Sequence, residues 1–454
     1  MSTSSQSELI EIKTDKLLSS TQPSSEKKSL NKTNSIDDNS SEGSTASRDS
    51  AISVWYSPIK EGSLRGAILS VIAGTFGAGC LTFPYAFSIV GLIPGISLLL
   101  FISLSMGLML KLLVKAGIKS KIFNFSNFAL ETLGPIWNNV YNVCSILLLV
   151  GAIMNYMLTS YEMIEQFSLQ IFGFDLQPYR IALFAGGCFL IQIPLSLFRD
   201  MSKLQYTSLI ASAMIFIVII IIVVEAPFYF IQNGAKGLTI PMFKSLSWDY
   251  LDATAIIMYG YMNHNAILQI ISEIKKPTLS RGNKVINRSW IVNFLFYLFI
   301  SLGGFISTLD QTPPIFIKRQ DLESFSPDYA IIASRAVIAI CLFSLIPLRW
   351  NLMREAIASL CKVEKMPPKK DIILTIVCMI SFNVIVYFVN IITIIGFIGG
   401  IVTVMISFII PLFGYQYVFR KKKMSFILIL GYILFGIFLV IGTGATVKSV
   451  VDFL

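Results

Sequence analysis

Three closely spaced glycines interrupt the first long apolar segment of the chain. Gly74, Gly77 and Gly79 lie in the stretch 66–90, which is long enough to cross a bilayer. A helix that only spans a membrane does not need them, and backbone unwinds at membrane depth only where it lines a cavity or is buried in protein. An unwound point offers N–H groups that can hold a carboxylate and carbonyls that can hold a cation. The segment therefore predicts a small-molecule site built from backbone groups.

The apolar segment 251–273 carries a second polar interruption in its middle. Gly260 is followed by Asn263 and His264, a combination that is costly in lipid and should face a cavity or another helix. His264 is the single histidine of the chain. Its charge can change near neutral pH, which makes it a proton-coupling candidate. The alternative is a neutral histidine that is hydrogen-bonded inside the helix bundle.

Other polar groups inside apolar segments are weaker site candidates. Asn155 and Tyr156 lie deep in the stretch 136–160, where they fit a helix that lines a polar path. Arg335 lies inside the stretch 329–349, near its predicted outer end. We expect Arg335 to snorkel to the interface, the alternative being a substrate carboxylate or a buried acid as its partner.

Several kinds of chemistry are absent from the sequence. The six cysteines lack metal-ligand spacing, and one histidine cannot form a histidine-based metal cluster. The stretch 442–449 resembles a phosphate loop but lacks the glycine before Lys448. No nucleophile–base pair is readable. We therefore expect no catalytic residues, no metal, no cofactor and no enzymatic activity.

The composition indicates an all-α polytopic membrane protein. Of the 454 residues, 54% are hydrophobic and only 14% are charged, whereas soluble domains are nearer a quarter charged. The low charge comes from long uncharged runs of membrane length. These runs predict eleven spans, near 66–90, 94–114, 136–160, 180–198, 206–226, 251–273, 290–310, 329–349, 371–389, 391–417 and 425–447.

The first 62 residues have a different composition from the rest. They are rich in Ser, Thr, Asn, Lys and Glu, with very few aromatic residues, and such a segment cannot bury a core. We expect residues 1–62 to be a disordered cytoplasmic tail and residues 63–450 to be the transmembrane domain. The net charge of +10 resides in short loops between spans and does not point to a nucleic-acid partner.

The distribution of Lys and Arg predicts the orientation in the bilayer. With the N-terminus in the cytoplasm, the cytoplasmic loops hold 21 Lys and Arg residues and the opposite side holds six. The C-terminus then faces the outside or a vacuolar or lysosomal lumen. The membrane itself, plasma membrane or vacuolar or lysosomal membrane, stays open.

The two interrupted spans occupy matching positions. Spans 66–90 and 251–273 are the first members of two successive sets of five spans, and broken helices at matching positions in two halves mark transporter binding sites. This argument rests on position, because the halves share no obvious sequence similarity.

Four motifs in order resemble the amino acid/auxin permease family, which includes sodium-coupled neutral, proton-coupled and vacuolar amino acid transporters. The first is Gly74-Thr-Phe-Gly-Ala-Gly-Cys-Leu-Thr-Phe-Pro-Tyr-Ala. The others run from His264 through Glu273 to Pro277, over Pro347-Leu-Arg349, and over 391–411 with its Gly-Phe-Ile-Gly-Gly. Together they cover most of residues 62–450.

The resemblance implies a LeuT-like fold, with two inverted five-helix repeats plus one extra helix. It implies a substrate carboxylate near Thr75, Gly77, Ala78 and Gly79, and a substrate amino group near Tyr259 and Gly260. Apolar residues such as Phe76 and Tyr261 would then surround the substrate side chain. No acid is well placed for a cationic substrate, so neutral amino acids are the expected class, with aromatic and cationic ones left open.

The chain departs from the sodium-coupled members of that family. They carry an asparagine about where this chain has Ala73 or Gly74, and the eighth span offers few hydroxyls, chiefly Ser334 and Ser344. We therefore expect proton coupling or uncoupled exchange, with sodium as the alternative.

The function that follows is a secondary amino acid transporter that works by alternating access. An amino acid sensor with little transport is one alternative. A carrier of another small organic solute, such as a polyamine or a quinoline-like base, is the other.

Overall fold

The computed structural model describes residues 62–198, 201–235, 239–320, 328–361, 363, 367–420 and 426–453. The predicted tail, apart from Gly62, lies outside these residues. Residues from Ile59 to Leu454 form one compact unit, and its described part is almost entirely helical.

Nine helices among the described residues are long and apolar enough to cross a membrane, as the composition predicted. They are α5 (Leu92–Ser120), α7 (Pro135–Phe172), the stretch Gln177–Leu197 with α8 (Arg180–Gly186) and α9 (Ile193–Leu197), α10 (Met201–Ala235), α13 (Leu279–Thr308), α14 (Tyr329–Leu360), α15 (Pro368–Phe388), the stretch Ile391–Phe419 with α16 (Ile391–Phe397) and α17 (Ile410–Phe419), and α18 (Phe426–Val451).

The first predicted span is a broken helix. It consists of α3 (Leu64–Thr75), a 3₁₀ turn (Ala78–Thr82) and α4 (Phe83–Val90), with a bend of 53° between its two arms. The helix stops at Thr75 because Phe76 and Gly77 are extended. Pro84 lies in the first turn of α4, where a proline is tolerated. The unwinding predicted from the glycines is therefore confirmed.

The sixth predicted span is broken in a similar way. Its arms are α11 (Asp249–Gly260) and α12 (His264–Ser272), and the chain between them is not helical. Asp249 and Asp252 lie in the first turn of α11, where carboxylates interact favourably with the helix dipole. With these two pairs of arms, each predicted span has a counterpart among the described helices.

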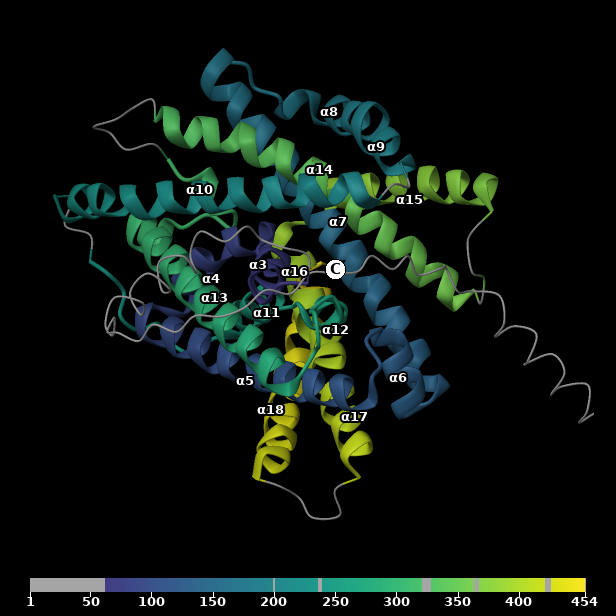
Figure 1. The fold of residues 1–454 in the computed structure, drawn as a ribbon. Coiled ribbons are helices and arrows are strands. Elements are labelled where there is room, and N and C mark those ends of the chain that lie inside the picture. Colours follow the sequence, from purple (N-terminus) through teal and green to yellow (C-terminus); the bar gives the residue numbers. More distant parts are fainter. Residues whose placement is uncertain are drawn as a thin grey trace, which may run out of the picture. The chain divides into compact units, whose positions relative to one another are not determined.

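The broken helices lie inside a shell of longer ones. In Figure 1, α3, α4, α11 and α12 occupy the middle of the drawing, with α10 and α14 on one side and α17 and α18 on another. α13 packs against α3, α4 and α5, while α11 packs against α4 and α12 against α5. The short helix α6 (Phe125–Leu133) packs on α7 and α17. This packing keeps the unwound backbone away from lipid.

The tenth predicted span packs closely through its glycines, since small residues let helix backbones approach each other. A Cβ on Gly399 would collide with the carbonyl oxygen of Ala255 in α11, and a Cβ on Gly396 would collide with Ser449 in α18. The same stretch contains two π turns, at residues 398–402 and 405–409. The close approach of α11 to this span therefore requires glycine.

Candidate functional site

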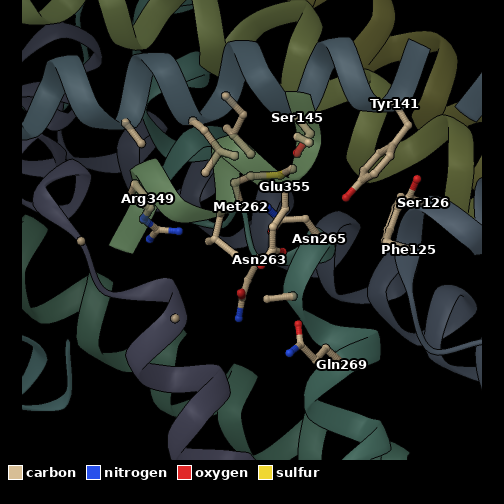
Figure 2. Close-up of a pocket in the computed structure, with 18 of the residues that line it drawn as sticks. Phe125, Ser126, Tyr141, Ser145, Met262, Asn263, Asn265, Gln269, Arg349 and Glu355 are labelled. Atoms are coloured by element: carbon tan, nitrogen blue, oxygen red, sulfur yellow. The ribbon is translucent and has the colours of Figure 1, made fainter. Parts of the chain in front are cut away.

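A cavity of about 670 Å³ lies where the two broken helices meet. Its walls come from both breaks and from α6, α7, α12 and α14. Figure 2 shows Arg349 on one side, Phe125, Ser126 and Tyr141 on the other, and Asn263 between them. Predicted site residues on its lining are Gly74, Thr75, Gly77, Gly79, Tyr156, Tyr259, Gly260 and Asn263.

A network of amide and hydroxyl groups holds the end of α3. The Thr75 hydroxyl donates to the carbonyl of Val71 at 2.6 Å. The Asn263 amide donates to the same carbonyl at 3.1 Å and to Thr75 Oγ1 at 3.4 Å. From α13, Asn293 also donates to Thr75 Oγ1, at 3.1 Å. These bonds tie the two breaks together and fix the polar wall that Thr75 and Asn263 present to the cavity.

Two tyrosines approach the backbone of the first break. A Cβ on Gly77 would lie 3.3 Å from the hydroxyl oxygen of Tyr156, and a Cβ on Gly79 would lie 2.8 Å from the ring of Tyr259. Since a Cβ contact under 3.0 Å forces a neighbour to move, only glycine fits at position 79. The backbone at this bend thus lies between two phenol groups.

Ala78 begins the 3₁₀ turn, between the lining residues Gly77 and Gly79. Two predicted aromatic residues of the first and sixth spans are placed differently. Phe76 is buried and stacks on Phe296 with ring centroids 4.0 Å apart, and Tyr261 is buried with its ring 5.0 Å from that of Tyr297. Both aromatic side chains pack against α13 and are not among the cavity-lining residues, whereas we expected them to surround the substrate side chain.

Asn155 and Arg335 also lie outside the lining residues. Asn155 is fully buried and accepts a hydrogen bond from Thr159 at 3.2 Å. Arg335 is 1% exposed and donates to the backbone carbonyls of Ile317 and Arg319, each at 3.0 Å. It is therefore enclosed in protein rather than snorkelling to the interface, because the chain before α14 supplies backbone acceptors for its guanidinium.

His264 is the first residue of α12 and is fully buried. Its Nε2 lies 3.3 Å from the carbonyl oxygen of Met106 in α5, and its Nδ1 has no hydrogen-bond partner among the described residues. The cavity lining includes its neighbours Asn263 and Asn265 but not His264 itself. The imidazole therefore points into the contact between α12 and α5.

The cavity wall contains a guanidinium that the distribution of charge does not predict. Arg349 of α14 lines the cavity, and its Nη2 donates to the Tyr156 hydroxyl at 3.3 Å. In the sequence, Arg349 is one of the 21 Lys and Arg residues counted in the cytoplasmic loops. The spacing of Asn265, Gln269 and Ser272, all lining residues, is a helical polar stripe that could have identified the wall formed by α12.

Two helices broken at matching positions around a polar cavity define a transporter of the LeuT-like class. The solved inward-facing conformation of Mhp1 shares this fold, with a TM-score of 0.54 over 86% of this chain and 90% of that chain, at 11% sequence identity. Residues 60–450 match the family described as transmembrane amino acid transporter protein. The chain belongs to this family.

Curated relatives carry transporter names. A Danio rerio protein provisionally named sodium-coupled neutral amino acid transporter 11 is 23% identical over 320 residues, which is 69% of this chain and 70% of the relative. The Danio rerio sodium-coupled neutral amino acid symporter 2 is 23% identical over 432 residues, covering 88% and 84%. A Plasmodium berghei amino acid transporter is 22% identical, and the match spans only 47% of its length. These relatives are transporters and not enzymes, as expected for this chain.

Proposed function

We propose that this protein is a secondary transporter of amino acids and that the cavity at the two helix breaks is its substrate site. The backbone N–H groups of Gly77, Ala78 and Gly79, next to Thr75, would hold the substrate carboxylate. The carbonyl end of α11, at Tyr259 and Gly260, would hold the amino group. The observation that carries the proposal is the meeting of a helix N-terminus and a helix C-terminus at one polar cavity, since the two dipoles match a zwitterion.

Neutral amino acids are the proposed substrates. Beside the breaks, the cavity has an apolar wall formed by Leu148, Leu149, Ala152 and Met262, which suits an uncharged substrate side chain. The names of the two Danio rerio relatives point in the same direction.

Proton coupling or uncoupled transport is proposed, rather than sodium coupling. The asparagine of sodium-coupled members is replaced by Ala73 or Gly74, and the Tyr297 hydroxyl already lies 2.9 Å from the carbonyl oxygen of Thr75. A sodium ion at the Thr75 carbonyl would have to compete with this hydroxyl. His264, buried beside the second break, is the proposed proton carrier. A symporter of this kind needs no cofactor.

The orientation proposed from Lys and Arg makes this conformation inward-facing. The cavity extends to Asn124, Ser272 and Ser359, next to the predicted cytoplasmic loops. On the opposite side no residue of the described loop 239–248 is among the cavity-lining residues. The N-terminus would then be cytoplasmic and the C-terminus outside or lumenal, in the plasma membrane or a vacuolar or lysosomal membrane.

Uptake by the purified full-length protein in proteoliposomes tests the proposal. Labelled neutral amino acids are supplied with an inward proton gradient, an inward sodium gradient, or no gradient. We expect accumulation with the proton gradient, or equilibration without one. Accumulation that requires sodium would contradict the proposed coupling. A protein that binds amino acids without uptake would contradict transport and favour a sensor.

A further inference from the structure

The cavity is poor in charge. Of its lining residues only Arg349 and Glu355, both from α14, are charged. Glu355 is exposed, whereas Arg349 is half-buried beside Tyr156. The lining near the helix breaks therefore contains one cationic group and no anionic one.

Arg349 lies close to the unwound backbone of the first break. Its Nη2 donates to the Tyr156 hydroxyl at 3.3 Å, and a Cβ on Gly77 would lie 3.3 Å from the same oxygen. A single phenol oxygen therefore separates the guanidinium from the bend. A ligand whose carboxylate is held at Gly77 would extend its other end within reach of Arg349.

The other buried arginines of the described chain are engaged by protein acceptors. Arg354 contacts Asp371 at 2.9 Å, Arg319 is paired with Glu225, and Arg335 donates to backbone carbonyls. Within the described residues, Arg349 has no carboxylate within 4 Å, and a neutral phenol is its acceptor. A half-buried guanidinium that lines a cavity and has a phenol as its acceptor favours an oxygen acceptor supplied by a ligand.

We propose that Arg349 is the residue that determines side-chain specificity. Its guanidinium binds the oxygen of a substrate side chain, so the site takes amino acids with carboxamide or carboxylate side chains and excludes those with cationic ones. The planar fork of arginine matches a carboxylate or an amide oxygen, and a like charge in a cavity opposes lysine and ornithine. The inference rests on the proposed function and extends it: among neutral amino acids it favours those with carboxamide side chains, and it adds acidic amino acids to the accepted substrates.

Binding and uptake are measured separately to test this inference. Purified full-length protein is titrated with glutamine, glutamate, leucine and lysine, and each is also tested as a competitor of glutamine uptake in proteoliposomes. We expect glutamine and glutamate to bind more tightly than leucine, and lysine to bind least. In Arg349→Gln, the affinity for glutamate falls about tenfold or more, and the affinity for leucine changes little. Lysine then begins to compete with glutamine uptake.

Two further variants make the result decisive. Arg349→Lys keeps the positive charge and loses the planar guanidinium. We therefore expect lysine to stay excluded and the affinity for glutamate to fall. This variant also replaces Arg349→Gln in the test if Arg349→Gln does not fold. Arg288→Gln changes an exposed arginine of α13 that lies outside the cavity lining and should behave as wild type. Equal losses for glutamate and leucine in Arg349→Gln, or lysine binding to the wild type as well as glutamine, would overturn the inference. Discriminating binding without uptake would instead contradict transport.

Discussion

The Tyr297 hydroxyl lies 2.9 Å from the carbonyl oxygen of Thr75, the last residue of α3. The same hydroxyl lies 2.8 Å from the carbonyl oxygen of Gly260, the last residue of α11. Each helix break leaves carbonyls without an intrahelical partner, and lipid cannot supply one. One buried phenol of α13 therefore contacts the unwound ends of both broken helices.

Replacing this phenol should destabilise the protein. In Tyr297→Phe the two carbonyls lose their hydrogen-bond donor, and an unsatisfied buried acceptor costs about 1–3 kcal/mol. We expect a lower thermal unfolding midpoint for the detergent-solubilised protein. Tyr329→Phe is the control, because Tyr329 is 70% exposed. Equal midpoints for wild type and Tyr297→Phe would mean that water satisfies these carbonyls as well as the phenol does.

Gly77 should not tolerate a side chain. In Gly77→Val the new methyl groups would enter the space between the bend and the Tyr156 hydroxyl, 3.3 Å from a Cβ, where the substrate carboxylate is proposed to bind. We expect uptake at background level from a protein that still reaches its membrane. Gly436→Val is the matched control, since an added Cβ there meets no atom within 4 Å. Normal uptake by Gly77→Val would remove this site from consideration.

The proton-coupling role of His264 predicts a change in pH dependence. A glutamine at this position can donate to the Met106 carbonyl, as Nε2 of the histidine can, but it does not titrate. We expect His264→Gln to flatten the uptake profile between about pH 5 and 8 and to retain exchange of labelled for unlabelled substrate without a gradient. A profile identical to wild type would leave His264 only its packing and hydrogen-bonding role between α12 and α5.

The orientation predicts that the native sequons stay unmodified. Asn124 caps α6 and lines the cavity, and Asn287 is exposed near the start of α13; both lie on the predicted cytoplasmic side, as do Asn31 and Asn39 outside the described residues. We expect no mobility shift after glycosidase treatment of protein from a eukaryotic host. Ser245→Asn, which creates a sequon on the opposite side of the membrane, should produce a shift. The reverse pattern would invert the topology.

Much of the architecture is readable from the sequence because membrane solvation is a strong constraint. A run of uncharged residues predicts each span, and glycine within a span predicts unwinding, as at Gly77. The site as a meeting of two breaks follows from their matching positions. Composition and spacing therefore predict the helices and the location of the cavity.

Side-chain direction is where the sequence argument is insufficient. Asn265 and Gln269 of α12 line the cavity and His264 of the same helix does not, because each step along a helix rotates the side chain by about 100°. Arg335 and Arg349 lie on the same helix, yet one is enclosed by backbone carbonyls and the other faces the cavity. Only the packing of α14 against its neighbours distinguishes them.

The size of the cavity has a consequence for the solvent that accompanies transport. A cavity of about 670 Å³ has room for many water molecules. Closing this chamber on a small solute must expel most of that water, so the closed conformation is the drier one. A sugar that is too large to enter the cavity should therefore shift the equilibrium towards the closed conformation, because it is excluded from the water that the open cavity holds.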